Sequence, residues 1–104
     1  MNNIKISLDA MGGDNAPKII VEGASEAKTR YPDIIFNFFG NENEIYPLIN
    51  KYSNLYNSKV FHTDYFVKSN DKPSNIIRKG VNTSMAMSIK HVKEGNSHAI
   101  VSAG

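Results

Sequence analysis

A glycine-containing segment near the N-terminus carries the residue types that suit anion binding. It reads Asp9-Ala10-Met11-Gly12-Gly13-Asp14 and directly follows residues 4–8, whose alternating apolar and polar side chains indicate a strand. Two adjacent glycines let backbone N–H groups approach a ligand closely, and a helix after the loop presents the positive end of its dipole. The segment therefore predicts a phosphate-type site in which Gly12 and Gly13 supply backbone donors.

Other features narrow this chemistry. Many strand-to-helix turns contain glycine for backbone reasons alone, and that alternative stays open. The chain contains neither the G-x-G-x-x-G dinucleotide pattern nor a G-x-x-x-x-G-K-[ST] P-loop. It has no cysteine, and its three histidines are scattered without metal-ligand spacing. We therefore expect no disulfide, no thiolate nucleophile, no metal and no cofactor.

Four strand-like segments position these residues: 4–8, 34–39, 59–63 and 99–102. The run at 34–39 is almost wholly apolar, which is typical of a parallel strand covered on both faces. Helical patterns alternate with the strands, so we expect crossover connections and a doubly wound, mostly parallel, Rossmann-like α/β sheet.

Three apolar patterns predict the helices. The first comprises Ile20, Ala24, Ala27 and Tyr31, with Asp14 or Asn15 as its cap and Pro17 in its first turn. The second spans residues 45–52, with Asn41 or Asn43 as cap and Pro47 as an awkward interior residue. The third comprises Met85, Ile89 and Val92 and stops at Gly95.

Length and charge exclude several classes of protein. With 104 residues the chain can form one domain, and we interpret residues 1–104 as the N-terminal part of a single α/β domain truncated after its fourth strand. A net charge of +2 gives no reason to expect nucleic acid as a partner. No apolar run reaches membrane-spanning length and no signal peptide is recognisable, so we expect a cytoplasmic location.

Three segments together resemble one known family. The first is Leu8 to Asp14 with Pro17. The second combines Pro73, Ile77-Arg78, Thr83-Ser84-Met85 and Val92 to Gly95, and the third is Val101-Ser102-Ala103-Gly104. In this order and spacing they resemble the bacterial phosphate acyltransferases of phospholipid synthesis (the PlsX family). The family more often has a Ser-Ser pair where Thr83-Ser84 stands, and its members are much longer than this chain.

The resemblance implies an activity and partners. Members convert acyl-[acyl carrier protein] and inorganic phosphate into acyl phosphate and free acyl carrier protein. They usually act as homodimers, and their substrates make a peripheral membrane contact plausible. Their fold is similar to that of the isopropylmalate dehydrogenases and phosphotransacetylases.

The residues that match the family motifs form the predicted substrate and phosphate site. Arg78 is the expected bidentate phosphate ligand, and the hydroxyls of Ser84 and Ser102 are expected donors to phosphate. Asp9 is expected to orient other site groups, and Asp14 either joins the site or caps the helix. No catalytic residue is assigned. The whole set is Asp9, Gly12, Gly13, Asp14, Arg78, Ser84, Ser102 and Gly104.

Two other interpretations remain open from the sequence. One is a truncated, non-catalytic α/β fragment that at most binds phosphate or pairs with a partner. The other is an unrelated phosphate- or nucleotide-binding α/β domain.

Overall fold

The computed structural model describes residues 3–67 and 71–102. Strands and α-helices alternate, with two short 3-10 helices (η) in the connections. The elements in chain order are β1 (Lys5–Asp9), α1 (Lys18–Arg30), β2 (Ile35–Gly40), α2 (Glu42–Ile49), η1 (Ser53–Leu55), β3 (Lys59–His62), α3 (Pro73–Lys79), η2 (Gly80–Asn82), α4 (Ser84–Lys93) and β4 (Ala99–Ser102).

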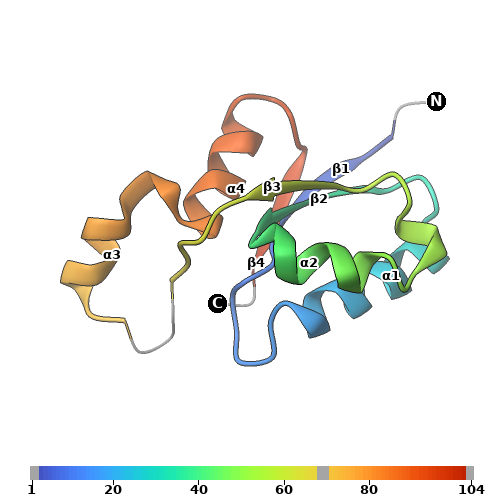
Figure 1. Ribbon diagram of the computed structural model, residues 1–104. Coiled ribbons are helices and arrows are strands. Elements are labelled where there is room, and N and C mark those ends of the chain that lie inside the picture. The colour runs from blue at the N-terminus through green and yellow to red at the C-terminus, as the bar shows by residue number, and fades with distance from the viewer. Residues whose placement is uncertain (1–2, 68–70, 103–104) are drawn as a thin grey trace.

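The four strands form one parallel sheet in the order β3-β2-β1-β4, which confirms the predicted doubly wound α/β class. The chain first moves from β1 outward to β3, then crosses back to place β4 on the other side of β1. Right-handed crossovers put the helices of these two directions on opposite faces. Figure 1 accordingly shows α1 and α2 along one side of the sheet and α4 on the other.

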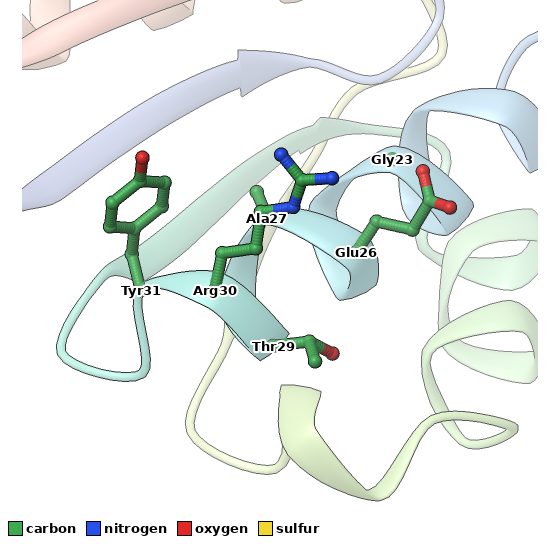
Figure 2. A pocket seen from close by; sticks show the side chains of 6 residues that line it. All are labelled: Gly23, Glu26, Ala27, Thr29, Arg30 and Tyr31. Atoms are coloured by element: carbon green, nitrogen blue, oxygen red, sulfur yellow. The ribbon is translucent and has the colours of Figure 1, made fainter.

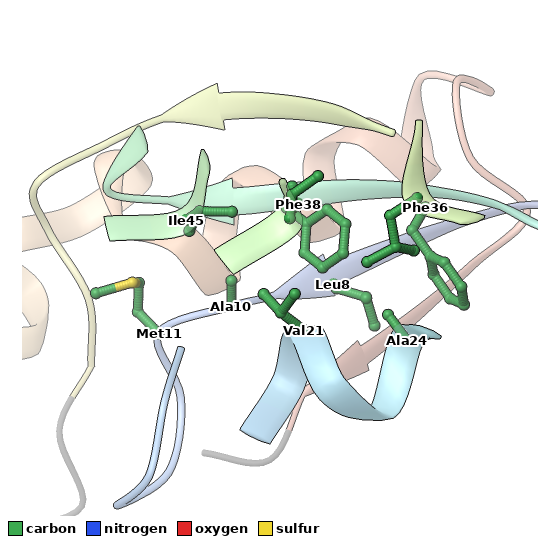
Figure 3. Close-up of a cluster of buried hydrophobic side chains, with 10 residues drawn as sticks. Leu8, Ala10, Met11, Val21, Ala24, Phe36, Phe38 and Ile45 are labelled. Carbon is green, nitrogen blue, oxygen red and sulfur yellow. The ribbon is translucent and has the colours of Figure 1, made fainter. Parts of the chain in front are cut away.

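The apolar core lies between the sheet and the α1–α2 layer (Figure 3). Phe36 and Phe38 of β2 point into this core, and Ile45 and Ile49 of α2 close it from the other side. Asn37 and Phe39 alternate with them and are buried on the α4 face. The predicted double coverage of this strand is therefore confirmed, because β2 lies in the sheet interior under helices on both faces.

The first helix differs from its prediction in two ways. It begins at Lys18 with Pro17 at the N-cap and no side-chain cap, so neither Asp14 nor Asn15 caps it. Its fully buried face comprises Val21, Ala24, Ser25 and Lys28. Of the predicted apolar stripe only Ala24 is buried in this way, and Tyr31 remains 63% exposed.

The last helix also turns a different face inward. Its buried residues are Ser84 and Ser88, whereas Ile89, expected in the core, is 45% exposed. The reason is the surface that α4 covers, because the sheet presents the polar side chains of Ser7, Asp9 and Asn37 there. Polar side chains buried under a helix need hydrogen-bond partners, and serines supply them where apolar residues cannot.

Candidate functional site

A buried carboxylate joins three elements at the carboxyl end of the sheet. Asp9, the last residue of β1, is only 1% exposed. Its Oδ1 accepts hydrogen bonds from the Ser84 hydroxyl at 2.5 Å and from the Met11 backbone N–H at 3.2 Å. Its Oδ2 accepts the Ser102 hydroxyl at 3.0 Å. We call Asp9, Ser84 and Ser102 the Asp9 cluster.

The topology explains why these distant residues meet. Ser102 ends β4, the parallel neighbour of β1, and the register pairs it with Asp9. Ser84 opens α4, whose N-terminal turn carries a partial positive charge that favours a nearby carboxylate. β1 and β4 also flank the point where the strand order reverses, and ligands of open α/β sheets bind in the crevice at that point.

Residues 10–14, which we call the glycine loop, follow β1 at the same edge of the sheet. Gly12 is buried, whereas Gly13 and Asp14 are exposed, and Gly13 has a φ of 90°, a region that glycine adopts readily. Within the described parts of the chain, neither glycine N–H has a hydrogen-bond partner in the protein. The N–H of the exposed Gly13 is therefore available to an external acceptor.

The hydroxyls of both predicted serines donate to the Asp9 carboxylate. Ser84 is fully buried and Ser102 is exposed. Their role as donors to phosphate stays a prediction. Thr83, and not Ser84, caps α4, because its side chain accepts the Ala86 N–H.

Two predicted residues, Arg78 and Asp14, lie outside this cluster. Arg78 is exposed on α3, which Figure 1 shows at the end of the sheet where the strands finish but apart from the strands themselves, so its role as a phosphate ligand stays a prediction. Asp14 is exposed on the loop without capping a helix. Gly104 lies outside the described residues. Lys79, next to Arg78, forms an ion pair with Asp71 at 2.9 Å.

A second polar layer lies farther down the same face, and sequence reasoning missed it. Ser97 Oγ accepts hydrogen bonds from Ser7 Oγ at 2.9 Å and from Asn37 Nδ2 at 3.0 Å. The Nδ1 atom of His91 lies 2.9 Å from the same oxygen. The available signal was a polar residue between two large apolar residues in each strand, Ser7 in β1 and Asn37 in β2.

The environment of His91 disfavours its charged form. Burial lowers the pKa of the imidazole, and the charges of Lys5 and Lys59 lower it further, while Glu94 opposes them. Within residues 3–67 and 71–102 no group of three or more histidine, aspartate or glutamate side chains is placed to hold a metal ion. The His91 ring packs against the rings of Phe39 and Phe61.

Known proteins match almost the whole of this sequence. The sequence profile of the fatty acid synthesis protein family matches residues 4–104. The phosphate acyltransferase of Pediococcus pentosaceus is 43% identical over 101 residues, which cover 97% of this chain and 28% of that protein. The phosphate acyltransferase of Enterococcus faecalis is 45% identical over 101 residues, covering 97% of this chain and 29% of that protein.

A third relative, the phosphate acyltransferase of Parvibaculum lavamentivorans, is 43% identical over 103 residues and is covered to 28% of its length. The chain therefore spans less than a third of the curated relatives that it matches. The interpretation as an unrelated nucleotide-binding domain is wrong. The chain belongs to the fatty acid synthesis protein family.

Proposed function

We propose that this chain forms part of a phosphate acyltransferase that converts acyl-[acyl carrier protein] and inorganic phosphate into acyl phosphate and free acyl carrier protein. The observation that carries the proposal is the Asp9 cluster, which lies beside the glycine loop at the switch point of a sheet whose relatives are named phosphate acyltransferases. The homodimer, the cytoplasmic location and a peripheral membrane contact belong to the same proposal. Among the described residues, no helix is long and apolar enough to cross a bilayer.

The reaction requires positioning more than a strong base. Phosphate is already largely dianionic at neutral pH, by analogy with phosphoesters, whose second pKa is about 6. A phosphate oxygen forms a bond to the thioester carbonyl carbon, and the carbon–sulfur bond then breaks. The thiolate of the carrier protein leaves and takes up a proton. A site for this step needs donors that hold the phosphate dianion and donors for the oxyanion that develops on the carbonyl.

The residues of this chain divide those tasks. The backbone N–H of the exposed Gly13 is the donor available to phosphate, and that of Gly12 stays a predicted donor. Asp9 would repel a dianion directly, so we assign it as a positioning residue that holds the loop, β4 and α4 in register through its three hydrogen bonds. Ser84 is a positioning residue for the same reason. The exposed Ser102 lies at the crevice, where Asp9 sets the direction of its hydroxyl.

The test is phosphate-dependent release of the carrier-protein thiol from a long-chain acyl-[acyl carrier protein]. We would compare the 104-residue chain with a fusion in which the remaining sequence of the Pediococcus relative follows residue 104. We expect activity in the fusion and a loss of about tenfold or more in kcat on Asp9→Ala, because the three hydrogen bonds that anchor the site are then lost. Lys51→Ala, at an exposed lysine beyond α2, is the matched control and should retain activity.

Other outcomes separate the alternatives. Activity in the 104-residue chain alone would mean that these residues suffice, and the interpretation as a truncated, incomplete site would be wrong. A folded fusion that releases no thiol at any phosphate concentration would overturn the proposed function. Arg78→Ala should raise the apparent KM for phosphate, and an unchanged KM would remove Arg78 from the site.

A further inference from the structure

An apolar groove between α1 and β4 leaves part of the core open to solvent. Its volume is about 390 Å³, and its floor includes Leu8 and Phe36, which belong to the core itself. Apart from the tyrosine hydroxyl, every side chain that lines it is apolar. The lining residues are Ile6, Leu8, Ile19, Ile20, Gly23, Ala24, Ala27, Tyr31, Ile34, Phe36 and Val101.

Large apolar side chains stand exposed around this groove. Ile19 is 53% exposed, Tyr31 63% and Val101 54%. Single exposed hydrophobic residues are ordinary, but residues gathered along one groove indicate an interaction surface. The groove also contains Ile20, Ala27 and Tyr31 of the stripe whose spacing predicts a buried helix face. Ile20 and Ala27 are only partly buried and Tyr31 is exposed, so this stripe has the sequence of a core face but is incompletely covered.

Gly23 lies at the centre of this surface without a local reason to be glycine. It is in the middle of α1, where glycine weakens a helix relative to alanine, and a Cβ built there would meet nothing within 4 Å. A second hollow of about 550 Å³ adjoins it and shares Gly23, Ala27 and Tyr31 with the apolar groove. Figure 2 shows Glu26 and Arg30 beside these residues, so the second hollow has a charged flank.

We propose that the groove is the docking site of an amphipathic helix from the part of the polypeptide that the relatives carry outside the matched region. More than two thirds of each relative lies outside that region, so ample polypeptide is available to cover the groove. The bare helix backbone at Gly23 lets the axis of a second helix approach closely. The docked helix buries its apolar side over Ala27 and Val101 and turns its polar side towards Glu26 and Arg30.

The right-handedness of crossover connections excludes one segment as the docked helix. β4 is an edge strand, and a right-handed crossover from it to a strand beyond carries its helix over the α4 face. The groove lies on the opposite face, with α1. The docked helix therefore belongs to a later segment and not to the connection that directly follows β4. The inference depends on the family and not on the reaction catalysed.

Cysteine labelling tests the proposal cleanly, because the chain has no cysteine of its own. Ile19→Cys and Ala27→Cys place single thiols in the groove, and Tyr56→Cys, at a residue 83% exposed near η1, is the control. In the 104-residue chain we expect all three to react. In a fusion with the remainder of the Pediococcus relative, with any cysteine in it replaced by serine, we expect the two groove thiols to react at least about tenfold more slowly and the control to be unchanged.

The intact Pediococcus relative, with single cysteines at the aligned positions, provides a naturally folded comparison. Three labelling results are then possible. Equal labelling of groove and control thiols in both longer proteins would overturn the proposal. Protection that appears in the 104-residue chain alone and grows with its concentration would assign the groove to a second copy and would also overturn it. Protection only in the longer proteins would support it.

A substitution at Gly23 separates docking from folding. Gly23→Leu should leave the melting temperature of the 104-residue chain unchanged or raise it, since the added side chain meets open space. In the fusion it should abolish the protection of Ala27→Cys by filling the groove. Glu22→Leu, the exposed neighbour outside both hollows, is the matched control. Retained protection in the Gly23→Leu fusion would contradict close approach at this residue.

Discussion

Replacing Asp9 should lower the stability of the 104-residue chain by a predictable amount, because one carboxylate satisfies three donors from three elements. In Asp9→Ala, the fully buried Ser84 hydroxyl and the Met11 N–H lose their acceptor, whereas the exposed Ser102 hydroxyl can turn to water. An unsatisfied buried donor costs about 1–3 kcal/mol. Relief from burying a charge offsets part of this, so we expect a net loss of about 2–3 kcal/mol in the free energy of unfolding.

The isosteric variant should cost less. In Asp9→Asn, the side-chain oxygen can still accept from Ser84 and Met11, and the amide group can donate to the exposed Ser102 oxygen. The lost charge weakens each bond, so we expect a loss of about 1 kcal/mol. The order, with alanine costing more than asparagine, identifies hydrogen-bond satisfaction as the cause.

Urea unfolding at pH 7 followed by circular dichroism measures both losses. A double-mutant cycle with Ser84→Ala should give a coupling energy of about 1 kcal/mol or more, since the two side chains are in direct contact. An Asp9→Ala variant within about 0.5 kcal/mol of the parent chain, or a coupling energy near zero, would refute the reasoning. The carboxylate would then not hold the three elements together.

Four further substitutions test the packing elsewhere in the fold. Burial lowers the pKa of His91 in the folded chain, so the unfolded chain binds a proton more readily. The stability of the parent chain should therefore fall relative to His91→Gln as pH drops from about 7 to 5, and parallel urea midpoints for the two chains would contradict this. Burial also lowers the pKa of Lys28, so the contribution of this lysine to stability should rise as pH approaches 10.5. Lys28→Met should cost about 1–3 kcal/mol, because the Ile34 carbonyl and the Asn57 side-chain oxygen lose their donor. Thermal unfolding at pH 7 and 10 measures both effects. Gly40→Ala should cost about 1–3 kcal/mol in urea unfolding, because the added Cβ would lie 2.5 Å from Met11 Cγ. Gly23→Ala should stabilise the chain by about 0.4–1 kcal/mol, because its Cβ would meet open space. Equal effects of the two substitutions would show that the end of β2 adapts freely.

The sequence alone determined the class of fold and the family. Strand and helix patterns alternate along the chain, and the apolar run at 34–39 could only suit a strand covered on both faces. These are local patterns, set by backbone geometry and burial, so they can be read without the tertiary structure. The motif around Asp9, Gly12 and Gly13 indicated the family for the same reason, since its residues are contiguous.

Only the tertiary structure decided which residues meet and which helix faces are buried. Ser84 and Ser102 lie 75 and 93 residues from Asp9 along the chain, and no sequence pattern shows that both hydroxyls donate to its carboxylate. Helical spacing locates an apolar stripe but not the surface against which the helix packs. α4 turns serines inward because it covers a polar sheet face, and α1 leaves Tyr31 exposed because the sheet covers only its neighbouring face. The register between distant strands and the polarity of the opposing sheet face decide these contacts and buried faces, and both are properties of the assembled sheet.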